Sequence, residues 1–277
     1  MKILYMGTAA AEGWPALFCS CPICRQARTG RGRNLRTRTQ TLLDGDLLVD
    51  FPPDSYAHAT AYGVNFGDIH TLLVTHSHMD HWFPTDFVHR NELFAHDTTG
   101  CLDIYGNEAV HQAFVDAMSI DRFEAHPVDD VICFHVVHGG ETFRAGVWEI
   151  TAVPADHDKR EECLIYICQK DGKTVLYGHD TGLMLSQEAW ALLGRHRFDL
   201  VSLDATMGLH GMGHYHMSLE DVEQFIARLE AMDAIDERTL RVINHFSHNG
   251  GLNHEQLCEW GKRHNTLVTW DGMELDI

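Results

Sequence analysis

The chain has 277 residues, of which 44% are hydrophobic and 22% are charged. These are ordinary values for a folded domain, and they exclude intrinsic disorder. The net charge of -19 disfavours a nucleic-acid partner, because such binding normally needs a broad basic surface. Histidine is unusually abundant, with 21 residues, and this abundance is typical of metal-binding proteins. We expect a single domain over residues 1–277 that acts on a small molecule.

The N-terminal residues lack the long apolar region of a secretion signal, and no stretch approaches the roughly 18 apolar residues of a membrane span. We therefore expect a cytoplasmic protein with no membrane partner. Eight cysteines fit a reducing compartment if they serve as thiols or metal ligands. The sequence does not fix the oligomeric state, for which a homodimer is one expectation.

Short apolar runs separated by turn signals predict a β-rich first half. Asp44-Gly45 and Asp171-Gly172 are typical of hairpin turns. The predicted strands cover residues 2–6, 41–43, 47–49, 71–75, 132–137, 148–153, 163–168 and 174–177.

Helices and strands alternate in the last third of the chain. Helical spacing of apolar residues covers 185–193 and 219–231, and Ser218 with Asp221 resembles a capping box at the start of the second helix. This order predicts an α/β fold in which two sheets pack face to face with helices outside, an αββα sandwich. Further strands are predicted at residues 200–203, 240–243 and 267–270.

The strongest functional signal follows the predicted strand at 71–75, where residues 76–81 contain three imidazoles and one carboxylate. Imidazole nitrogen suits zinc and related metals, and a tight turn at a strand end can aim alternate side chains at two neighbouring ions. A polar surface loop is the alternative, but it does not require this spacing. The segment therefore predicts a metal site.

The HxHxDH spacing of residues 76–81 resembles the metallo-β-lactamase superfamily. The resemblance implies two catalytic divalent metals, for which zinc, manganese and iron all remain open. It favours hydrolysis over redox chemistry, because diiron relatives usually carry Glu at the position of His78. Each later ligand, taken alone, has an ordinary alternative as a core or turn residue. The implied ligands are His76, His78 and His157 for one metal, Asp80, His81 and His245 for the second, and Asp180 as the bridge.

A second cluster, Cys19, Cys21 and Cys24, has CxCxxC spacing that lets three thiolates converge on one tetrahedral ion. His248 is the best fourth ligand, because it lies three residues beyond His245. We expect one structural zinc here, with reduced buried thiols as the alternative. Buried positions are predicted for the remaining cysteines, Cys101, Cys133, Cys163, Cys168 and Cys258.

Together with Trp14-Pro15-Ala16 and the closing segment 271–274, these motifs resemble the phosphoribosyl cyclic phosphodiesterases of the carbon–phosphorus lyase pathway. Those enzymes open a ribose 1,2-cyclic phosphate, so the resemblance implies a small phosphorylated substrate. It implies that metal-bound hydroxide attacks phosphorus while Asp80 accepts a hydrogen bond from that hydroxide. Residues 82–130 do not match this family.

His216 resembles the active-site histidine of phosphodiesterases in this superfamily. It is expected to protonate the leaving oxygen or to bind a phosphate oxygen. His210 and His214 are competitors, and an ordinary loop histidine is the alternative. Arg36 and Arg38 lie in a basic run just before the strand that begins at Thr39, resemble a family position there, and are the better candidates for attracting a phosphorylated substrate. The alternative for the run is a solvated face paired with carboxylates.

Three other functions compete with the phosphodiesterase. A lactonase or thioesterase would use the same metals with no evident role for His216. A relative in pyrroloquinoline quinone biosynthesis resembles the CxCxxC segment and the fold, with an incomplete metal pattern. RNA processing is disfavoured by the acidic composition.

Overall fold

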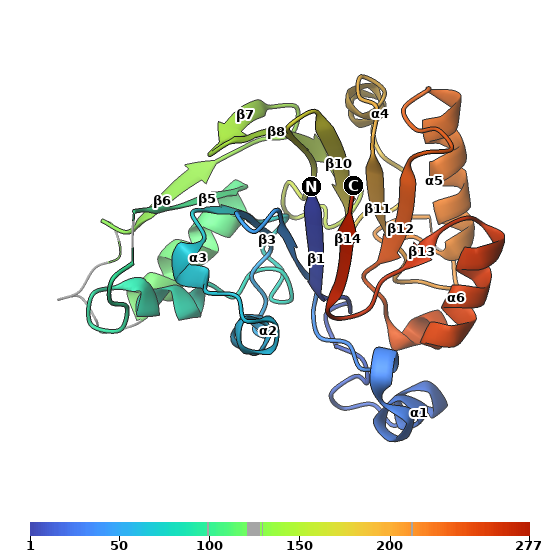
Figure 1. Cartoon of the computed structure of the whole chain (residues 1–277), viewed down its shortest axis with the longest axis horizontal. Helices are drawn as coiled ribbons and strands as arrows, with labels where there is room; N and C mark the ends of the chain where they lie inside the picture. The colour runs from blue at the N-terminus through green and yellow to red at the C-terminus, as the bar shows by residue number, and fades with distance from the viewer. Residues whose placement is uncertain (99, 121–127, 129, 212) are drawn as a thin grey trace.

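The computed structural model describes residues 1–98, 100–120, 128, 130–211 and 213–277. These residues form two mixed sheets of seven strands each. The sheets face each other, and the helices lie outside them (Figure 1). The predicted αββα sandwich is therefore confirmed. Among the described residues, no helix has the length and apolar character needed to cross a membrane.

The first sheet carries the N-terminal half of the chain and closes with its last strand. β1 pairs with both β2 and β14 in antiparallel fashion, whereas β3, β4, β5 and β6 run parallel to one another. The order is β14-β1-β2-β3-β4-β5-β6. Its strands are β1 (Lys2–Gly7), β2 (Gln40–Leu43), β3 (Leu47–Val49), β4 (Thr71–Leu73), β5 (Leu102–Gly106), β6 (Ile132–Val136) and β14 (Met273–Asp276).

The second sheet begins as an antiparallel meander and continues as a parallel βα arrangement. β7 to β10 pair antiparallel, and β10 to β13 pair parallel. The order is β13-β12-β11-β10-β9-β8-β7. Its strands are β7 (Thr142–Ala145), β8 (Trp148–Pro154), β9 (Leu164–Lys170), β10 (Lys173–Gly178), β11 (Leu200–Asp204), β12 (Leu240–Asn244) and β13 (Leu267–Val268).

The helices cover the outer faces of both sheets (Figure 1). α2 and α3 lie on the side of the first sheet, whereas α4, α5 and α6 lie on the side of the second. α1 projects from the lower end of the molecule. The helices are α1 (Pro22–Gly30), α2 (Ser55–Tyr62), α3 (Glu108–Ile120), α4 (Gln187–Leu193), α5 (Leu219–Ala231) and α6 (His254–Arg263).

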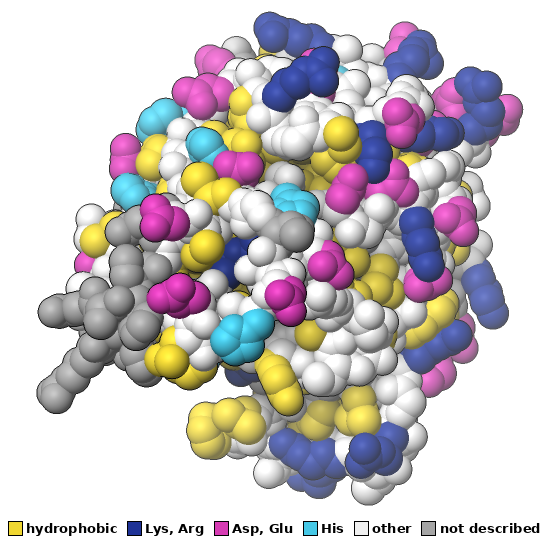
Figure 2. Space-filling model, turned by 60° about the vertical axis from the view of Figure 1, so that its left-hand side comes forward, with side chains coloured by type: hydrophobic (Ala, Val, Ile, Leu, Met, Phe, Trp, Pro, Cys, Tyr) yellow, Lys and Arg dark blue, Asp and Glu magenta, His cyan; other side chains and the backbone are white. Residues whose placement is uncertain are grey.

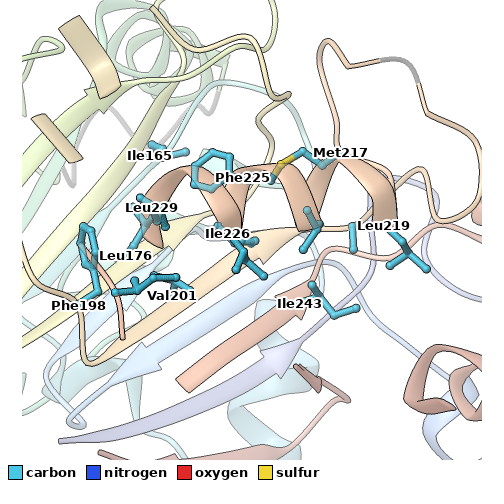
Figure 3. Packing of buried hydrophobic residues seen from close by; sticks show 14 of the residues in the cluster. Ile165, Leu176, Phe198, Val201, Met217, Leu219, Phe225, Ile226, Leu229 and Ile243 are labelled. Atoms are coloured by element: carbon cyan, nitrogen blue, oxygen red, sulfur yellow. The ribbon is translucent and has the colours of Figure 1, made fainter. Parts of the chain in front are cut away.

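α5 shows how the sequence encodes the outer layer. The Ser218 side chain accepts from the Asp221 N–H, and the Asp221 side chain accepts from the Ser218 N–H, so the predicted capping box is confirmed. Phe225 and Leu229 belong to the apolar face that packs on the sheet (Figure 3). This face joins α5 to β11 through the buried Val201.

Sequence periodicity located most strands but missed β5, β7 and β14 together with four helices. β7 and β14 are four residues long, too short to show a clear period, and α1 and α6 are polar on most of their surface. The unmatched segment 82–130 contains the 3-10 helix η3 (Pro84–Arg90), β5 and all of α3. Within it, residues 99, 121–127 and 129 lie outside the described part. Cys133 is exposed, so the expectation of a buried thiol there is wrong.

Candidate active site

The site is built where strands of both sheets end at the same edge of the sandwich. The HxHxDH segment follows β4, and His157 follows β8. Asp180 follows β10, and His245 directly follows β12. Because β10, β11 and β12 are parallel, their carboxyl ends meet and bring residues that are far apart in sequence into one place.

The first cluster consists of His76, His78 and His157, whose ring nitrogens lie within 4.8 Å of one another. Nε2 of His157 is 3.3 Å from Nδ1 of His78. The rings of His76 and His78 meet edge-on, with centroids 4.4 Å apart. Three imidazoles that face inward in this way match the donor set of a zinc-type site.

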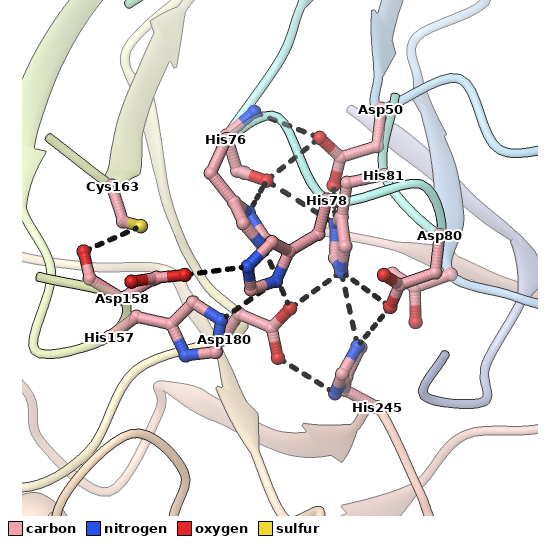
Figure 4. Close-up of polar contacts among 12 residues, drawn as sticks. Asp50, His76, His78, Asp80, His81, His157, Asp158, Cys163, Asp180 and His245 are labelled. Carbon is pink, nitrogen blue, oxygen red and sulfur yellow. Dashed lines mark hydrogen bonds and ion pairs between the residues drawn. The ribbon is translucent and has the colours of Figure 1, made fainter. Parts of the chain in front are cut away.

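The second cluster consists of Asp80, His81, Asp180 and His245 (Figure 4). Nε2 of His81 lies 2.6 Å from Oδ2 of Asp180 and 3.2 Å from Nε2 of His245. The same Asp180 oxygen lies 3.5 Å from Nε2 of His76 in the first cluster. One carboxylate therefore touches both clusters, in the position that the sequence predicted for a bridging ligand.

The chemistry of these side chains fits divalent cations. Nε2 of His76 and Oδ1 of Asp180 are buried, and the described residues offer neither atom a hydrogen-bond partner of suitable geometry. Leaving buried polar atoms unpaired is costly, so such atoms normally have a ligand. Burial raises the pKa of Asp180, but the nearby His245 and His81 lower it well below its ordinary value. Asp180 is therefore an anionic donor.

Asp50 holds His81 of the second cluster in position through a hydrogen bond, and sequence reasoning missed it. Its Oδ2 lies 2.8 Å from Nδ1 of His81, which leaves Nε2 free to face the site. Oδ1 accepts hydrogen bonds from the backbone N–H and the hydroxyl of Thr75, and the Tyr177 hydroxyl donates to Oδ2. The only sequence signal was a carboxylate directly after the predicted strand at 47–49.

Asp158 holds His78 of the first cluster in position in the same way. Its Oδ2 lies 3.0 Å from Nε2 of His78, so the Nδ1 atom of that ring faces His157. Asp158 also accepts from the guanidinium of Arg160. This contact fixes the ring orientation of the most exposed histidine of the cluster.

His216 lies beside both clusters. Its Nδ1 is 3.0 Å from Oδ2 of Asp204 and 3.1 Å from Oδ1 of Asp180. Burial lowers the pKa of His216, but the negative charges of Asp204 and Asp180 outweigh burial and raise it to about 11. Of its competitors, His210 is exposed, and Nδ1 of His214 lies 3.2 Å from Oδ2 of Asp156, the neighbour of His157.

Asp204 is a second residue that the sequence did not single out. It is fully buried at the end of β11, and its Oδ1 accepts from the N–H groups of Thr206 and Met217. These bonds hold the carboxylate rigidly behind His216. A single Asp at the end of an apolar run carries no spacing that would have identified it.

The cysteine cluster lies at the projecting end of the molecule, around the start of α1. Sγ of Cys21 is 3.5 Å and Sγ of Cys19 is 3.7 Å from Nδ1 of His248. With Cys24, these ligand atoms lie within 4.8 Å of one another. The structure therefore brings together all four residues predicted for a structural zinc, and their donor set of three sulfurs and one nitrogen fits that ion.

The arginines near this cluster differ from the sequence expectation. Arg36 is buried, donates to Thr8 Oγ1 and to the carbonyl of Thr269, and stacks on Phe246, so it is committed to the interior. Arg38 forms an ion pair with Asp54 at 3.1 Å. Figure 2 shows basic side chains at the lower end of the molecule, the end from which α1 projects in Figure 1.

Sequence comparisons place the chain among known proteins. A model of the beta-lactamase superfamily domain matches residues 47–236. An octanoyltransferase of Porphyromonas gingivalis is 32% identical over 85 residues, which are 29% of this chain and 16% of that protein. Coenzyme PQQ synthesis protein B of Methylobacterium nodulans is 34% identical over 94 residues, 29% of this chain and 31% of that protein. The matched part thus spans less than a third of either curated relative.

Solved structures share the fold at low sequence identity. A diphosphatase from the PhnP family superimposes with a TM-score of 0.75 at 20% identity, over 100% of this chain and 97% of that one. Zn²⁺-bound PqqB from Methylobacterium extorquens gives 0.73 at 19% identity over the full length of both chains. The short form of human tRNase Z gives 0.68 at 15% identity, over 100% and 99%.

Proposed function

The chain belongs to the metallo-β-lactamase superfamily, and from that premise we propose that it is a metal-dependent hydrolase of a small cyclic or nucleotide-like phosphodiester. One observation carries the proposal. Two clusters of metal-type donors share the carboxylate of Asp180, and His216, backed by Asp204, contacts that same carboxylate. A hydrolase of phosphodiesters needs this combination of a cation site and an adjacent proton donor.

The donors would hold two divalent cations, zinc or manganese, with Asp180 between them. His76, His78 and His157 belong to the first site. Bound cations of this kind polarise a phosphoryl oxygen and lower the pKa of a water ligand. The second site takes Asp80, His81 and His245, with Asp180 shared by both sites.

Two further roles involve protons: accepting a hydrogen bond from the attacking water, and donating a proton to the leaving oxygen. We assign the first to Asp80, which is also a donor of the second site, and the second to His216. The contacts of Asp80 with His81 and His245 use its Oδ2 atom. Oδ1 of Asp80 would then accept a hydrogen bond from the attacking water. The contacts of His216 with Asp180 and Asp204 use Nδ1, so Nε2 is the atom that can donate a proton to the leaving oxygen.

The comparisons support a phosphorus centre over a carbon centre. The similar structures include a diphosphatase and a tRNase Z. The net charge of -19 favours a small substrate over a long RNA. A lactonase or thioesterase would leave the His216–Asp204 pair without a task.

A second candidate is a protein that resembles PqqB and does not hydrolyse phosphodiesters. It is favoured by the 34% identity over 94 residues and by the TM-score of 0.73. The full set of seven donors in this chain argues for the hydrolase. Metal stoichiometry separates the two functions.

Metal analysis of the purified protein should be combined with hydrolysis of bis-para-nitrophenyl phosphate, before and after adding manganese or zinc. About three metals per chain, with turnover that depends on the added metal, are expected from two catalytic ions and one structural zinc. One metal per chain and no turnover would overturn the phosphodiesterase and favour the PqqB-like protein. Sedimentation of the same sample tests the predicted homodimer.

A further inference from the structure

Large apolar side chains stand exposed on the loops that carry the candidate site residues. Met79 lies between His78 and Asp80 in the sequence, and Tyr215 directly precedes His216. Met184 follows Asp180 by four positions. Single exposed apolar residues are normal on any protein, but their concentration around one site is typical of a ligand-binding surface. Their exposed fractions are 62% for Met79, 56% for Met184 and 46% for Tyr215.

Two of these side chains belong to loops that are bound to each other and to the first cluster. The N–H of Leu183 donates to the carbonyl of Gly213 at 3.0 Å, which joins the loop after β10 to the loop that carries His216. The N–H of Met184 donates to Asp156, the neighbour of His157. Cε of Met184 would lie 3.7 Å from a Cβ built on Gly213, two residues before Tyr215. Met184 and Tyr215 therefore border the same side of the site.

Tyr215 is held in an unusual backbone conformation. Its φ angle is +65°, in the left-handed region that a bulky residue rarely adopts. Nδ1 of His157 lies 2.8 Å from the Tyr215 carbonyl, and the two rings are 6.2 Å apart, edge to face. A strained backbone that persists beside a site is evidence that its side-chain position matters. The half-exposed ring of Tyr215 therefore lies beside His157 of the first cluster.

The nearby cations are already neutralised by carboxylates. Lys159 pairs with Asp156 at 2.9 Å, and Arg160 makes several bonds to Asp158. Asp158 in turn contacts His78. The border formed by Met184 and Tyr215 therefore offers an apolar, polarisable surface next to basic side chains that are paired with carboxylates.

We propose that Tyr215 and Met184 form a seat that stacks on a flat heteroaromatic ring of the substrate, beside the His/Asp clusters. The substrate is then a nucleotide-like phosphodiester, and a simple sugar phosphate would not fill the seat. The ring of Tyr215 supplies one π-face, and the thioether of Met184 contacts the ring edge. This inference rests on the proposed function, since it assigns the substrate class of that same site.

The test measures binding rather than turnover. Calorimetry of the metal-loaded protein should compare AMP, which carries a base, with ribose 5-phosphate, which does not. Tyr215→Ala should weaken AMP binding about tenfold, because stacking of a base on an aromatic side chain has an effect of this size. It should leave ribose 5-phosphate binding unchanged. The matched control Tyr215→Phe keeps the ring and should keep AMP binding.

Met184→Ala provides a second variant with an ordinary backbone, so a local rearrangement at Tyr215 cannot imitate the effect. It should weaken AMP binding by a smaller factor than Tyr215→Ala and again spare ribose 5-phosphate. Equal loss of both ligands in these variants, or no loss of either, overturns the seat.

The outcome for the seat is separable from the outcome for the proposed function. Base-selective binding that depends on Tyr215, without hydrolysis of any phosphodiester, would retain the seat and reject the hydrolase. Hydrolysis of bis-para-nitrophenyl phosphate, with AMP and ribose 5-phosphate bound equally by the parent protein, would retain the hydrolase and reject the seat.

Discussion

The first and second clusters together form a His/Asp centre. This centre and the cysteine cluster lie at opposite ends of the segment 245–248, and they draw their donors from the chain in different ways. The centre takes its donors from the ends of strands in both sheets, and most of these side chains are buried. The cysteine cluster takes three of its four donors from one short stretch around the start of α1 (Figure 1). Phe18, within that stretch, is 97% exposed.

The difference separates what a metal does for function from what it does for stability. The strands that hold the centre are fixed by the two-sheet core, which includes Tyr5, Trp148 and Tyr177. Leu17 and Phe18, just before the cysteines, are exposed, so we expect the conformation around the cysteines to depend on their ligands. Loss of a donor should therefore stop catalysis in the centre and unfold a local segment in the cluster.

Asp80→Ala should have the largest effect on activity, lowering kcat for bis-para-nitrophenyl phosphate by at least about a thousandfold. The fold should remain, because Asp80 contacts site residues rather than the sheet core. Steady-state kinetics and the circular dichroism spectrum measure the two properties. Asp116→Ala, on the exposed face of α3, is the surface control and should match the parent protein. Activity retained in Asp80→Ala would contradict the assigned role.

Asp204→Asn should lower kcat about a hundredfold, because the amide no longer holds the imidazole of His216 as a charged proton donor. KM should change little, since Asp204 is buried behind His216. His216→Gln should give a similar loss. If the pair acts as a unit, the double variant should be no worse than His216→Gln alone. Additive losses would show that Asp204 acts independently of His216.

Cys21→Ser should act mainly on stability, with one metal fewer per chain and activity retained within about tenfold. Cys21 is both a cluster donor and the N-cap of α1, where its side chain accepts from the Cys24 N–H. We expect a loss of about 2 kcal/mol in unfolding free energy, or about 4–8 °C in Tm. Calorimetry and limited proteolysis of the α1 region measure this. Cys133→Ser, at an exposed thiol outside the cluster, is the control.

The same contrast explains what could be predicted from sequence. The donors of both clusters were found because they fall in compact motifs or directly after apolar strands, where spacing carries the chemistry. Asp50, Asp158 and Asp204 were missed because their histidine partners lie 31, 80 and 12 positions away in the sequence. A carboxylate that supports a ligand has no spacing rule of its own.

The order of the predicted elements was enough to identify the fold class, but several individual elements were not predicted from the sequence. α2 has apolar and polar residues on every side and shows little amphipathic period. Arg36 was a candidate for attracting the substrate because it resembles a family position, yet the fold buries it against Phe246 and Trp14. Burial of a charged residue depends on tertiary partners that one sequence does not reveal.

His58 tests the scaffold away from both clusters, through an effect that appears only when the pH is lowered. It is buried on α2, with Nδ1 2.7 Å from Oε1 of Gln40 and Nε2 2.7 Å from Oγ1 of Thr37. Burial lowers its pKa to about 4, although the charge of Asp54 opposes this. The unfolded chain, with an ordinary histidine pKa near 6.5, therefore takes up this proton more readily than the folded chain does.

Stability from the neutral form of His58 is complete above about pH 6.5 and is lost as the pH falls toward 4. By this linkage, the contribution at pH 5 is smaller than at pH 7.5 by about 2 kcal/mol. The drop in unfolding free energy between these two pH values should therefore be about 2 kcal/mol smaller for His58→Gln than for the parent protein. Urea unfolding at the two pH values measures this drop in unfolding free energy. The samples are treated with chelator first, so that metal release at low pH does not contribute. His70→Gln, at an exposed site, is the control. An identical drop in His58→Gln and the parent would mean that the pKa of His58 is the same in the folded and the unfolded chain.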